Sequence, residues 1–282
     1  MDKNVLNAIE ANIIVHSRMA DEYNAKEPHF RPESIERVKG IIKSINDSTP
    51  ITKALDLGCG TGFMINILKD YAKEITGVDV TQAMLDKVDK TGNASINLIN
   101  SDTGTAELPV EYFDIATAYT FLDHLYDMKP TFENTYRSLN KGGVFYADLS
   151  PSFYFWNAIK NLDFDRSYDS ILSREINAVL KKDEEIEKEF GIDKNIFAMA
   201  EHQKHKLGGL SEELLTKELK SVGFNRVTFI YHWFIGQAEL INNSSLNNEH
   251  RKLISQQMHE YLLRSMPLSR HLFKYIGFIA YK

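Results

Sequence analysis

The stretch from Lys53 to Met64 carries the residues whose types and spacing best suit ligand chemistry. A short apolar run leads into Gly58, Gly60 and Gly62, and an apolar, helix-compatible segment follows them. This pattern predicts a buried parallel strand, a tight turn and a helix. Glycine allows the unusual backbone angles of such a turn, and the free N–H groups at the start of the helix favour a ligand with negative charge.

Two carboxylates flank this turn and suggest what it binds. Asp79 ends a second apolar run, Ile75 to Asp79, about twenty residues beyond the first glycine. An acid at the end of the second strand is placed to accept both hydroxyls of a ribose, so the sequence predicts a nucleoside site. Asp56, just before the glycines, indicates that the group beyond the ribose carries an ammonium rather than a pyrophosphate.

Two other glycine-rich motifs fit the sequence less well. A phosphate-binding Walker loop requires a Gly-Lys-Ser/Thr sequence, and none follows the turn. The dinucleotide fingerprint counted from Gly58 requires a glycine at position 63, where this chain has Phe63. An NAD-dependent oxidoreductase on a similar sheet, and a non-catalytic binding module, remain as alternative function classes.

Residues 56–62 and 77–85 together resemble the Rossmann-like (class I) S-adenosylmethionine-dependent methyltransferases. Residues 100–103 resemble the adenine-binding turn of that family, and residues 113–143 resemble its fourth strand, next helix and fifth-strand entry. The resemblance covers about residues 30–150 and resumes at 208–233. It implies an α/β fold: a doubly wound, seven-stranded sheet, mostly parallel, with an antiparallel last strand.

The resemblance also implies S-adenosylmethionine as cofactor and a set of contacts to it. Arg31 is expected either to pair with the cofactor carboxylate or to cap a surface helix, and both readings stay open. Asp102 is expected to accept the adenine amino group, although aspartate is also a common turn former. The residues assigned to the cofactor are Tyr23, Arg31, Asp56, Gly58, Cys59, Gly60, Thr61, Gly62, Asp79, Val80, Met84, Ser101, Asp102, Thr103 and Tyr119.

Methyl transfer from a sulfonium needs little chemistry from the protein beyond holding the acceptor in line. A hydroxyl or acidic carbon acceptor also needs a general base, and His124 follows the predicted fourth strand close to the cleft. The alternative is that His124 only shapes the cofactor site. Other candidate general bases are His16, His29, His202, His205 and His232. His202 and His205 have metal-ligand spacing but no evident third ligand, so no metal is expected.

Alternating apolar segments predict the order of the elements. Strands are expected near 53–57, 74–79, 95–100, 113–119 and 143–149, and helices near 62–71, 82–89 and 129–139. Ser211 is a candidate N-cap of a helix that Gly223 ends, before a strand at 226–234 and a closing strand at 272–281. An amphipathic helix is expected at 4–20 and another helix at 33–45. Between them, Pro28 and Pro32 predict an irregular segment.

The additions to this pattern suggest a cover over the site. We expect a helical cap over 1–32, a cofactor-binding core over 33–150, an insertion or lid over 151–209, and the rest of the core over 210–282 with a helical, polar insertion near 236–268. The first insertion opens with Phe153, Tyr154 and Trp156, which we predict to form the wall of an acceptor pocket. Its charged run, Lys181 to Glu189, predicts a solvated helix face.

The composition limits the classes of binding partner that we expect for this chain. A net charge of −6 gives no broad basic surface, so no nucleic acid is expected and the acceptor is predicted to be a small molecule. The single cysteine, Cys59, rules out an internal disulfide and fits a cytoplasmic location. No membrane-length apolar run or signal-peptide pattern is evident, so no membrane partner is expected. The helical additions are candidate contacts for a homo-oligomer.

Overall fold

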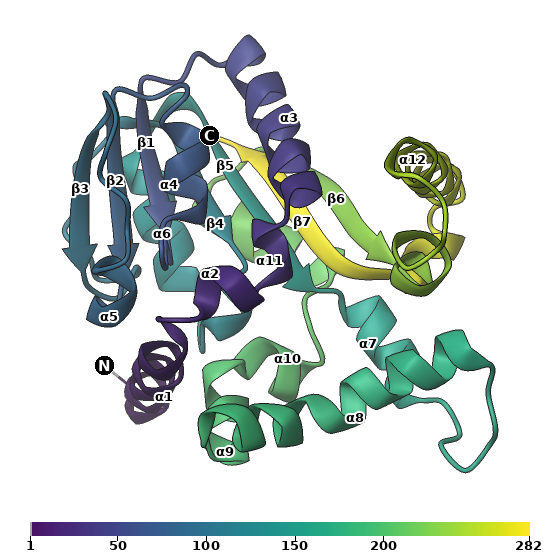
Figure 1. Ribbon diagram of the computed structural model, residues 1–282. Helices are drawn as coiled ribbons and strands as arrows, with labels where there is room; N and C mark the ends of the chain where they lie inside the picture. Colours follow the sequence, from purple (N-terminus) through teal and green to yellow (C-terminus); the bar gives the residue numbers. More distant parts are fainter. Residues whose placement is uncertain (1) are drawn as a thin grey trace.

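The computed structural model describes residues 2–282, apart from the side chains of residues 179–186. A seven-stranded sheet of order β3-β2-β1-β4-β5-β7-β6 runs through the molecule (Figure 1). Strands β1 to β5 are parallel, and β7 lies antiparallel between β5 and β6. This confirms the predicted fold class. The strands are β1 Lys53–Leu57, β2 Glu74–Asp79, β3 Ser95–Asn100, β4 Phe113–Tyr119, β5 Leu139–Pro151, β6 Arg226–Phe234 and β7 Phe273–Tyr281.

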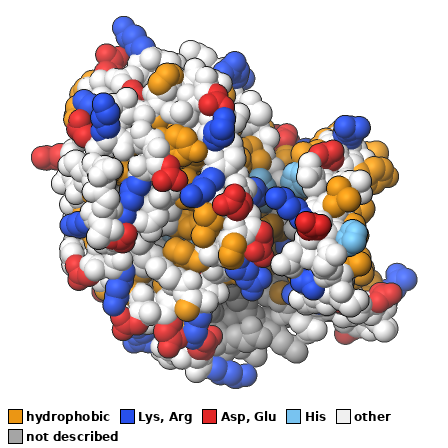
Figure 2. Space-filling view, turned by 45° about the horizontal axis from the view of Figure 1, so that its top comes forward, with side chains coloured by type: hydrophobic (Ala, Val, Ile, Leu, Met, Phe, Trp, Pro, Cys, Tyr) orange, Lys and Arg blue, Asp and Glu red, His pale blue; other side chains and the backbone are white. Residues whose placement is uncertain are grey.

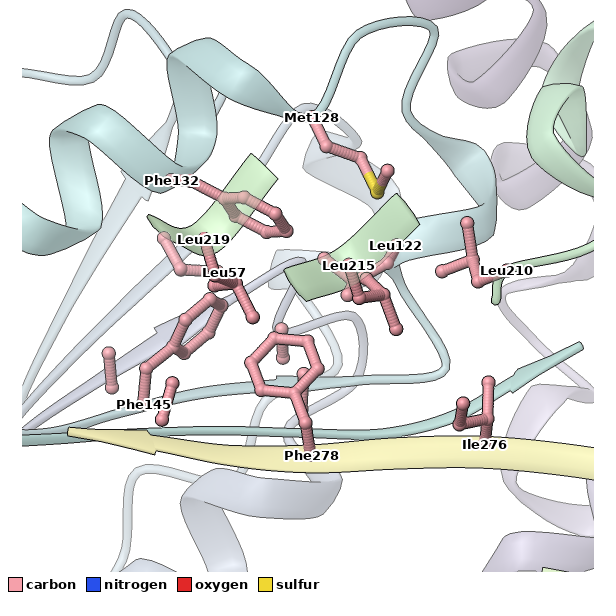
Figure 3. Packing of buried hydrophobic residues seen from close by; sticks show 14 of the residues in the cluster. Leu57, Leu122, Met128, Phe132, Phe145, Leu210, Leu215, Leu219, Ile276 and Phe278 are labelled. Atoms are coloured by element: carbon pink, nitrogen blue, oxygen red, sulfur yellow. The ribbon is translucent and has the colours of Figure 1, made fainter. Parts of the chain in front are cut away.

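Helices cover both faces of the sheet (Figure 1). One face packs against α3 and α4 through a cluster that includes Ile42 and Ile65, and the other packs against α6 and α11. On the second face Phe132 of α6 meets Phe145 of β5 with ring centroids 5.8 Å apart, and Phe145 meets Phe278 of β7 at 5.2 Å (Figure 3). The bounds of these helices are α3 Pro32–Ser48, α4 Phe63–Leu68, α5 Gln82–Leu85, α6 Lys129–Ser138 and α11 Glu212–Val222.

The helix α11 begins and ends as its sequence predicts. The Ser211 side chain accepts a hydrogen bond from the N–H of Leu214, so it caps the orphan donors of the first turn. Gly223 follows the last turn with φ 117°, a left-handed conformation that glycine adopts at little cost.

Several predicted boundaries differ from the structure, and the helix expected at 82–89 already ends at Leu85. The segment around Pro28 and Pro32 is largely helical rather than irregular, with α2 (Tyr23–Lys26), the 3₁₀ turn η1 (Pro28–Phe30) and then α3. Each proline sits at the first position of its helix, where the missing N–H costs nothing. The fifth strand is longer than predicted, because Leu139 already pairs with Phe113 before a register shift.

The remaining helices lie beyond the carboxyl ends of the parallel strands or beside β6 and β7 (Figure 1). Helix α1 packs against α9 through Ala11, Val15 and Met19, which contact Ile192, Phe197 and Ala200. Part of the predicted charged face, residues 181–186, lies outside the described side chains, and 187–189 are exposed as predicted. These elements are α1 Lys3–Met19, η2 Leu122–His124, α7 Phe153–Lys160, α8 Ser170–Phe190, α9 Lys194–Ala200, α10 His202–Leu207, η3 Gln237–Asn242, α12 Asn248–Arg264 and η4 Leu268–Leu272.

The second insertion forms a lobe of its own around α12. Figure 2 shows hydrophobic side chains on this lobe, where Leu253, Met258 and Tyr261 of α12 are exposed. Among the described residues, no helix combines the length and the apolar character needed to cross a membrane. The domain boundaries and a contact with a second copy stay predictions.

Candidate functional site

A cavity of about 340 Å³ opens at the carboxyl ends of the parallel strands, between the glycine turn and α1. Its walls come from α1, α2, the turn after β1, the ends of β2 and β3, the loop after β4 and the first turn of α6. The lining residues are Asp2, Val5, Ala8, Ile9, Asn12, His16, Tyr23, Gly58, Gly60, Asp79, Val80, Thr81, Met84, Asp102, Thr103, Gly104, Thr105, Thr120, Phe121, His124, Leu125, Tyr126, Asp127, Pro130 and Thr131.

Asp79 lies at the end of β2 with its carboxylate on the cavity wall. Its two oxygens accept backbone N–H groups, one from Gly60 at 2.9 Å and one from Thr81 at 2.8 Å. A carboxylate oxygen has two lone pairs, so each oxygen keeps one for a ligand hydroxyl. The geometry fits the predicted contact with both hydroxyls of a ribose.

The glycine turn leaves space for a ligand at one position. A Cβ built on Gly60 would meet nothing closer than the Met84 side chain at 3.8 Å, whereas one on Gly58 would strike the Phe121 ring at 2.0 Å. Gly62 has φ 91° and begins α4. Gly60 therefore presents bare backbone to the cavity, while Gly58 makes room for the wall residue Phe121.

Asp56 is a buried carboxylate with one oxygen left without a partner. Its Oδ1 accepts from Thr117 Oγ1 at 2.7 Å, and its Oδ2 has no hydrogen-bond partner among the described residues. Burial, partly offset by the Thr117 hydrogen bond, raises the pKa of Asp56 to about 7. An ammonium group is the kind of partner that such an oxygen lacks, so the residues present fit the predicted cofactor.

Two residues after β3 take part in the cavity wall. Asp102 Oδ1 accepts the N–H of Gly104 at 3.1 Å, so it also forms the turn. Thr103 Oγ1 shares a hydrogen bond with Thr131 of α6 at 2.8 Å. Both expectations for Asp102, adenine contact and turn former, are compatible with this geometry.

Tyr23 brings an aromatic hydroxyl from the N-terminal segment to the cavity. Burial, followed by the charge of Glu27, raises the pKa of Tyr23 far above its usual range. The hydroxyl stays protonated, so Tyr23 is a hydrogen-bond donor here and not a base.

Several residues predicted to bind the cofactor do not line the cavity. Cys59 is buried, and burial raises the pKa of its thiol, so it serves as a small spacer. Tyr119 is turned toward Arg37, whose Nη2 donates to its hydroxyl at 2.9 Å. Arg31 is exposed at the N-cap position of α3. The predicted residues absent from the lining are Arg31, Asp56, Cys59, Thr61, Gly62, Ser101 and Tyr119.

The predicted acceptor aromatics are placed on α7, outside the cavity lining. Phe153 packs against a hydrophobic cluster, and the Tyr154 hydroxyl donates to Glu213 Oε2 at 2.6 Å. The indole N–H of Trp156 is buried and lacks a hydrogen-bond partner among the described residues. The aromatic rings that do line the cavity are those of Tyr23, Phe121 and Tyr126.

His124 follows β4 in the turn η2 and faces the cavity, as its position in the sequence predicts. Its Nδ1 lies 2.9 Å from the carbonyl oxygen of Ala200, which can only accept, so Nδ1 carries the proton of the neutral ring. The Nε2 lone pair remains for a substrate proton. Within the described residues there is no group of three or more side chains able to hold a metal, so His202 and His205 gain no third ligand.

Arg37 is not among the residues predicted from the sequence. This residue extends from α3 to the ends of three strands, with Nη1 2.9 Å from Asp148 Oδ2 of β5 and 2.7 Å from His232 Nε2 of β6. The one signal was an arginine next to the buried stripe of Val38 and Ile42 in an otherwise amphipathic helix.

Comparison with known proteins gives consistent matches. Residues 55–147 match the family model described as "Methyltransferase domain". The "Ubiquinone biosynthesis O-methyltransferase" of Pseudomonas fluorescens is 26% identical over 161 residues, which cover 53% of this chain and 68% of that protein. The "Malonyl-[acyl-carrier protein] O-methyltransferase" of Serratia marcescens is 29% identical over 128 residues, which cover 45% and 48%.

A solved structure extends the likeness over the whole fold. A SAM-dependent methyltransferase from Thermotoga maritima, titled a possible histamine N-methyltransferase, superposes with a TM-score of 0.53 at 16% identity. The match covers 96% of this chain and 99% of that one. At this identity the comparison concerns the fold alone.

Proposed function

We propose that this chain, whose residues 55–147 match the methyltransferase family model, is a Rossmann-like, class I S-adenosylmethionine-dependent methyltransferase that transfers the methyl group to an acidic hydroxyl of a small-molecule acceptor. The observation that carries the proposal is one cavity whose wall joins the Gly60 backbone, the Asp79 carboxylate and His124, whose Nε2 has no hydrogen-bond partner among the described residues. The Gly60 backbone and the Asp79 carboxylate suit a bound nucleoside. His124 is placed to accept a proton from a group beside that nucleoside.

When bound, S-adenosylmethionine supplies an electrophilic sulfonium methyl. The residues that would hold it are Asp79 at the ribose, Asp102 and Met84 at the adenine, and Asp56 at the amino group. The role of the protein is then to bring the acceptor oxygen in line and to exclude water, which can account for about 7–11 kcal/mol of the barrier. His124 Nε2 is the base that takes the hydroxyl proton as the oxygen attacks.

An oxygen acceptor is supported by the two relatives, both named O-methyltransferases. A phenolic or enolic hydroxyl needs a base of moderate strength, which a neutral imidazole provides. The cavity wall also carries the aromatic rings of Tyr23, Phe121 and Tyr126 beside helix α1, which favours a small acceptor over a macromolecule. We therefore keep the lidded aromatic pocket in the proposal, with these rings as its wall, because the rings of α7 lie outside the cavity lining.

The cofactor part is tested by calorimetric titration with S-adenosylmethionine and with NAD. Asp79→Ala should weaken S-adenosylmethionine binding by roughly 2–4 kcal/mol, because a buried ribose loses a charged hydrogen-bond partner. Asp86→Ala is the matched control, since Asp86 is an exposed carboxylate at the end of α5. Binding of NAD but not of S-adenosylmethionine would favour the oxidoreductase alternative.

The transfer part is tested by incubating the protein with metabolite extracts and methyl-labelled S-adenosylmethionine. Label should appear in a small hydroxylated product, and demethylated cofactor should accumulate only when the acceptor is present. Cofactor binding without labelled product from any extract would leave a non-catalytic binding module as the better description.

A further inference from the structure

Two histidines from distant parts of the chain meet at the cavity wall. His16 lies near the end of α1, and His124 lies in the turn after β4. Their ring centroids are 4.9 Å apart and the rings are nearly perpendicular, at 84°. The two imidazoles therefore form one unit facing the same space.

The hydrogen bonds of this pair fix the tautomer of both rings. His16 Nδ1 lies 3.0 Å from the carbonyl oxygen of Asn12, and His124 Nδ1 lies 2.9 Å from that of Ala200. A carbonyl oxygen only accepts, so each Nδ1 must donate, and each neutral ring keeps its lone pair on Nε2. No hydrogen bond engages either Nε2 within the part of the chain described here. Both rings are thus prepared to accept a proton.

A hydrogen bond and apolar contacts hold helix α1 in place, so that His16 stays next to His124. The Asn12 side-chain amide donates to the carbonyl oxygens of Ala8, at 2.9 Å, and of His124, at 3.2 Å. Ala200, whose carbonyl orients His124, is also part of the apolar contact between α1 and α9. One docking surface therefore positions both imidazoles, and undocking α1 would separate them.

His16 is a neutral and weakly basic ring near pH 7, so it would hold a proton only briefly before passing it on. Burial, followed by the nearby His124, lowers the pKa of His16 to about 4, so the ring is neutral near pH 7. Glu201, at the end of α9, acts in the opposite direction by favouring the protonated ring. A proton taken up during the reaction would therefore meet a nearby negative charge.

We propose that His16 is a second catalytic base, carried to the reaction by the N-terminal helix, and that it acts with His124 on a phenolic or enolic acceptor. The inference rests on the proposed function. The acceptor oxygen forms a bond to the methyl carbon while the carbon–sulfur bond breaks, and its electron pair stays on sulfur as S-adenosylhomocysteine. The hydroxyl proton passes to Nε2 of one imidazole and then leaves to solvent.

The test compares His16→Ala with His250→Ala, using catechol and the hydroxylated acceptor obtained from the labelled extract. His250 is the matched control because it is exposed on α12 and does not line the cavity. His16→Ala should lower kcat by about 10²-fold, a typical contribution of a general base, with the affinity for S-adenosylmethionine changed less than twofold. Added imidazole should restore part of that rate in His16→Ala and have no effect on His250→Ala.

A second variant covers the case in which His16→Ala does not fold. His16→Gln keeps a polar side chain of similar length without a basic nitrogen, and it should show the same loss of kcat. A wild-type rate in either variant, a loss in His16→Ala that imidazole does not restore, or an equal loss of cofactor affinity and turnover would overturn the inference. Absence of product from the wild-type protein would instead overturn the proposed function, and the inference with it.

Discussion

Arg37 Nη1 and Asp148 Oδ2 lie 2.9 Å apart beneath the carboxyl ends of β4, β5 and β6. Burial alone would raise the pKa of Asp148, but His232 and Arg37 outweigh it and hold the pKa well below its usual range. Arg37 Nη1 also lies 2.7 Å from His232 Nε2, and Tyr146 donates to Asp148 at 2.6 Å. The pair is the centre of a buried polar cluster.

Three residues beside this cluster have strained backbone angles, and each directly follows a residue of the cluster. The residues that follow Tyr119, Asp148 and His232 have positive φ without being glycine: Thr120 at 49°, Leu149 at 54° and Trp233 at 49°. Such angles persist only where the surroundings hold them, and Thr120 is part of the cavity wall. The cluster therefore fixes three strand ends next to the site.

The first prediction concerns this ion pair. Asp148→Ala should lower the free energy of unfolding by about 3–5 kcal/mol, because Arg37 would be left buried without its counter-charge. The double variant Arg37→Met/Asp148→Ala should cost less than the sum of the two single changes, since neither charge remains. Urea unfolding of the four proteins measures the coupling, and strict additivity would show that the pair contributes nothing of its own.

A second prediction uses two glycines with similar backbone strain. Gly60 (φ 51°) lines the cavity, whereas Gly142 (φ 78°) lies in β5 with nothing within 4 Å of an added Cβ. Both alanine variants should lose roughly 1 kcal/mol of stability from the left-handed conformation. Only Gly60→Ala should also weaken S-adenosylmethionine binding, measured by calorimetry, and equal binding by both variants would remove the turn from the cofactor site.

A third prediction follows from the unpartnered oxygen of Asp56. Its pKa is about 7, and a bound ammonium would favour the ionised form. Affinity for S-adenosylmethionine should therefore fall as pH drops from 7.5 to 6, because binding must then release the Asp56 proton. Asp56→Asn should bind more weakly at pH 7.5 and flatten the pH dependence. A slope that survives in Asp56→Asn would assign it to another group.

A fourth prediction concerns the buried His29, which is only 3% exposed. Its ring packs among Tyr23, Phe30, Phe63 and Tyr119, and burial lowers its pKa to about 4. Between pH 6.5 and 4 the unfolded chain binds a proton here that the folded chain does not, so the free energy of unfolding falls as pH falls. His29 contributes up to about 1.4 kcal/mol per pH unit to that slope.

The measurement for His29 is denaturant unfolding at pH 7, 6 and 5. His29→Phe should reduce the slope, because the aromatic packing stays and the titrating group is gone. His250→Phe, at an exposed position of α12, is the control and should leave the slope unchanged. An unchanged slope in His29→Phe would mean that the pKa of His29 is the same in the folded and the unfolded chain.

The features of the site that the sequence could predict depend on residues that are close together in the chain. The glycines at 58, 60 and 62 all have positive φ, as a tight strand-to-helix turn requires. Asp79 ends its strand at the expected residue, because strand length and the alternation of elements are local signals. The N-cap of α11 at Ser211 and its C-terminal end at Gly223 also depend on residues close together in the chain.

The parts that could not be predicted depend on contacts between distant segments. Nothing near Arg37 in the chain indicates that Asp148, 111 residues away, will lie against it. The meeting of His16 with His124 likewise depends on how α1 docks on α9, which periodicity does not specify. Apolar clusters such as Phe153 to Trp156 are ambiguous for a related reason, since a ring that lines a pocket and a ring that fills a core have the same sequence signature.

The last prediction concerns Trp156, one of two tryptophans in the chain. Its indole N–H is buried without a partner among the described residues, and Lys204 lies over the ring at 5.4 Å. A buried donor without a partner costs about 1–3 kcal/mol, so either a ligand satisfies it or the protein tolerates the loss. Trp156→Phe keeps an aromatic ring beneath Lys204, and it removes the donor together with part of the ring volume.

If the acceptor uses this donor, Trp156→Phe should raise KM for the acceptor several-fold, and the affinity for S-adenosylmethionine should stay unchanged. Trp156→Ala should impair turnover further, because the packing is lost as well. Trp233→Phe is the control at the other tryptophan, which packs edge-on against Tyr275. A Trp156→Phe variant with unchanged KM and a higher free energy of unfolding would show that the N–H is simply a buried, unsatisfied group. The acceptor wall would then be formed by the cavity rings of Tyr23, Phe121 and Tyr126 alone.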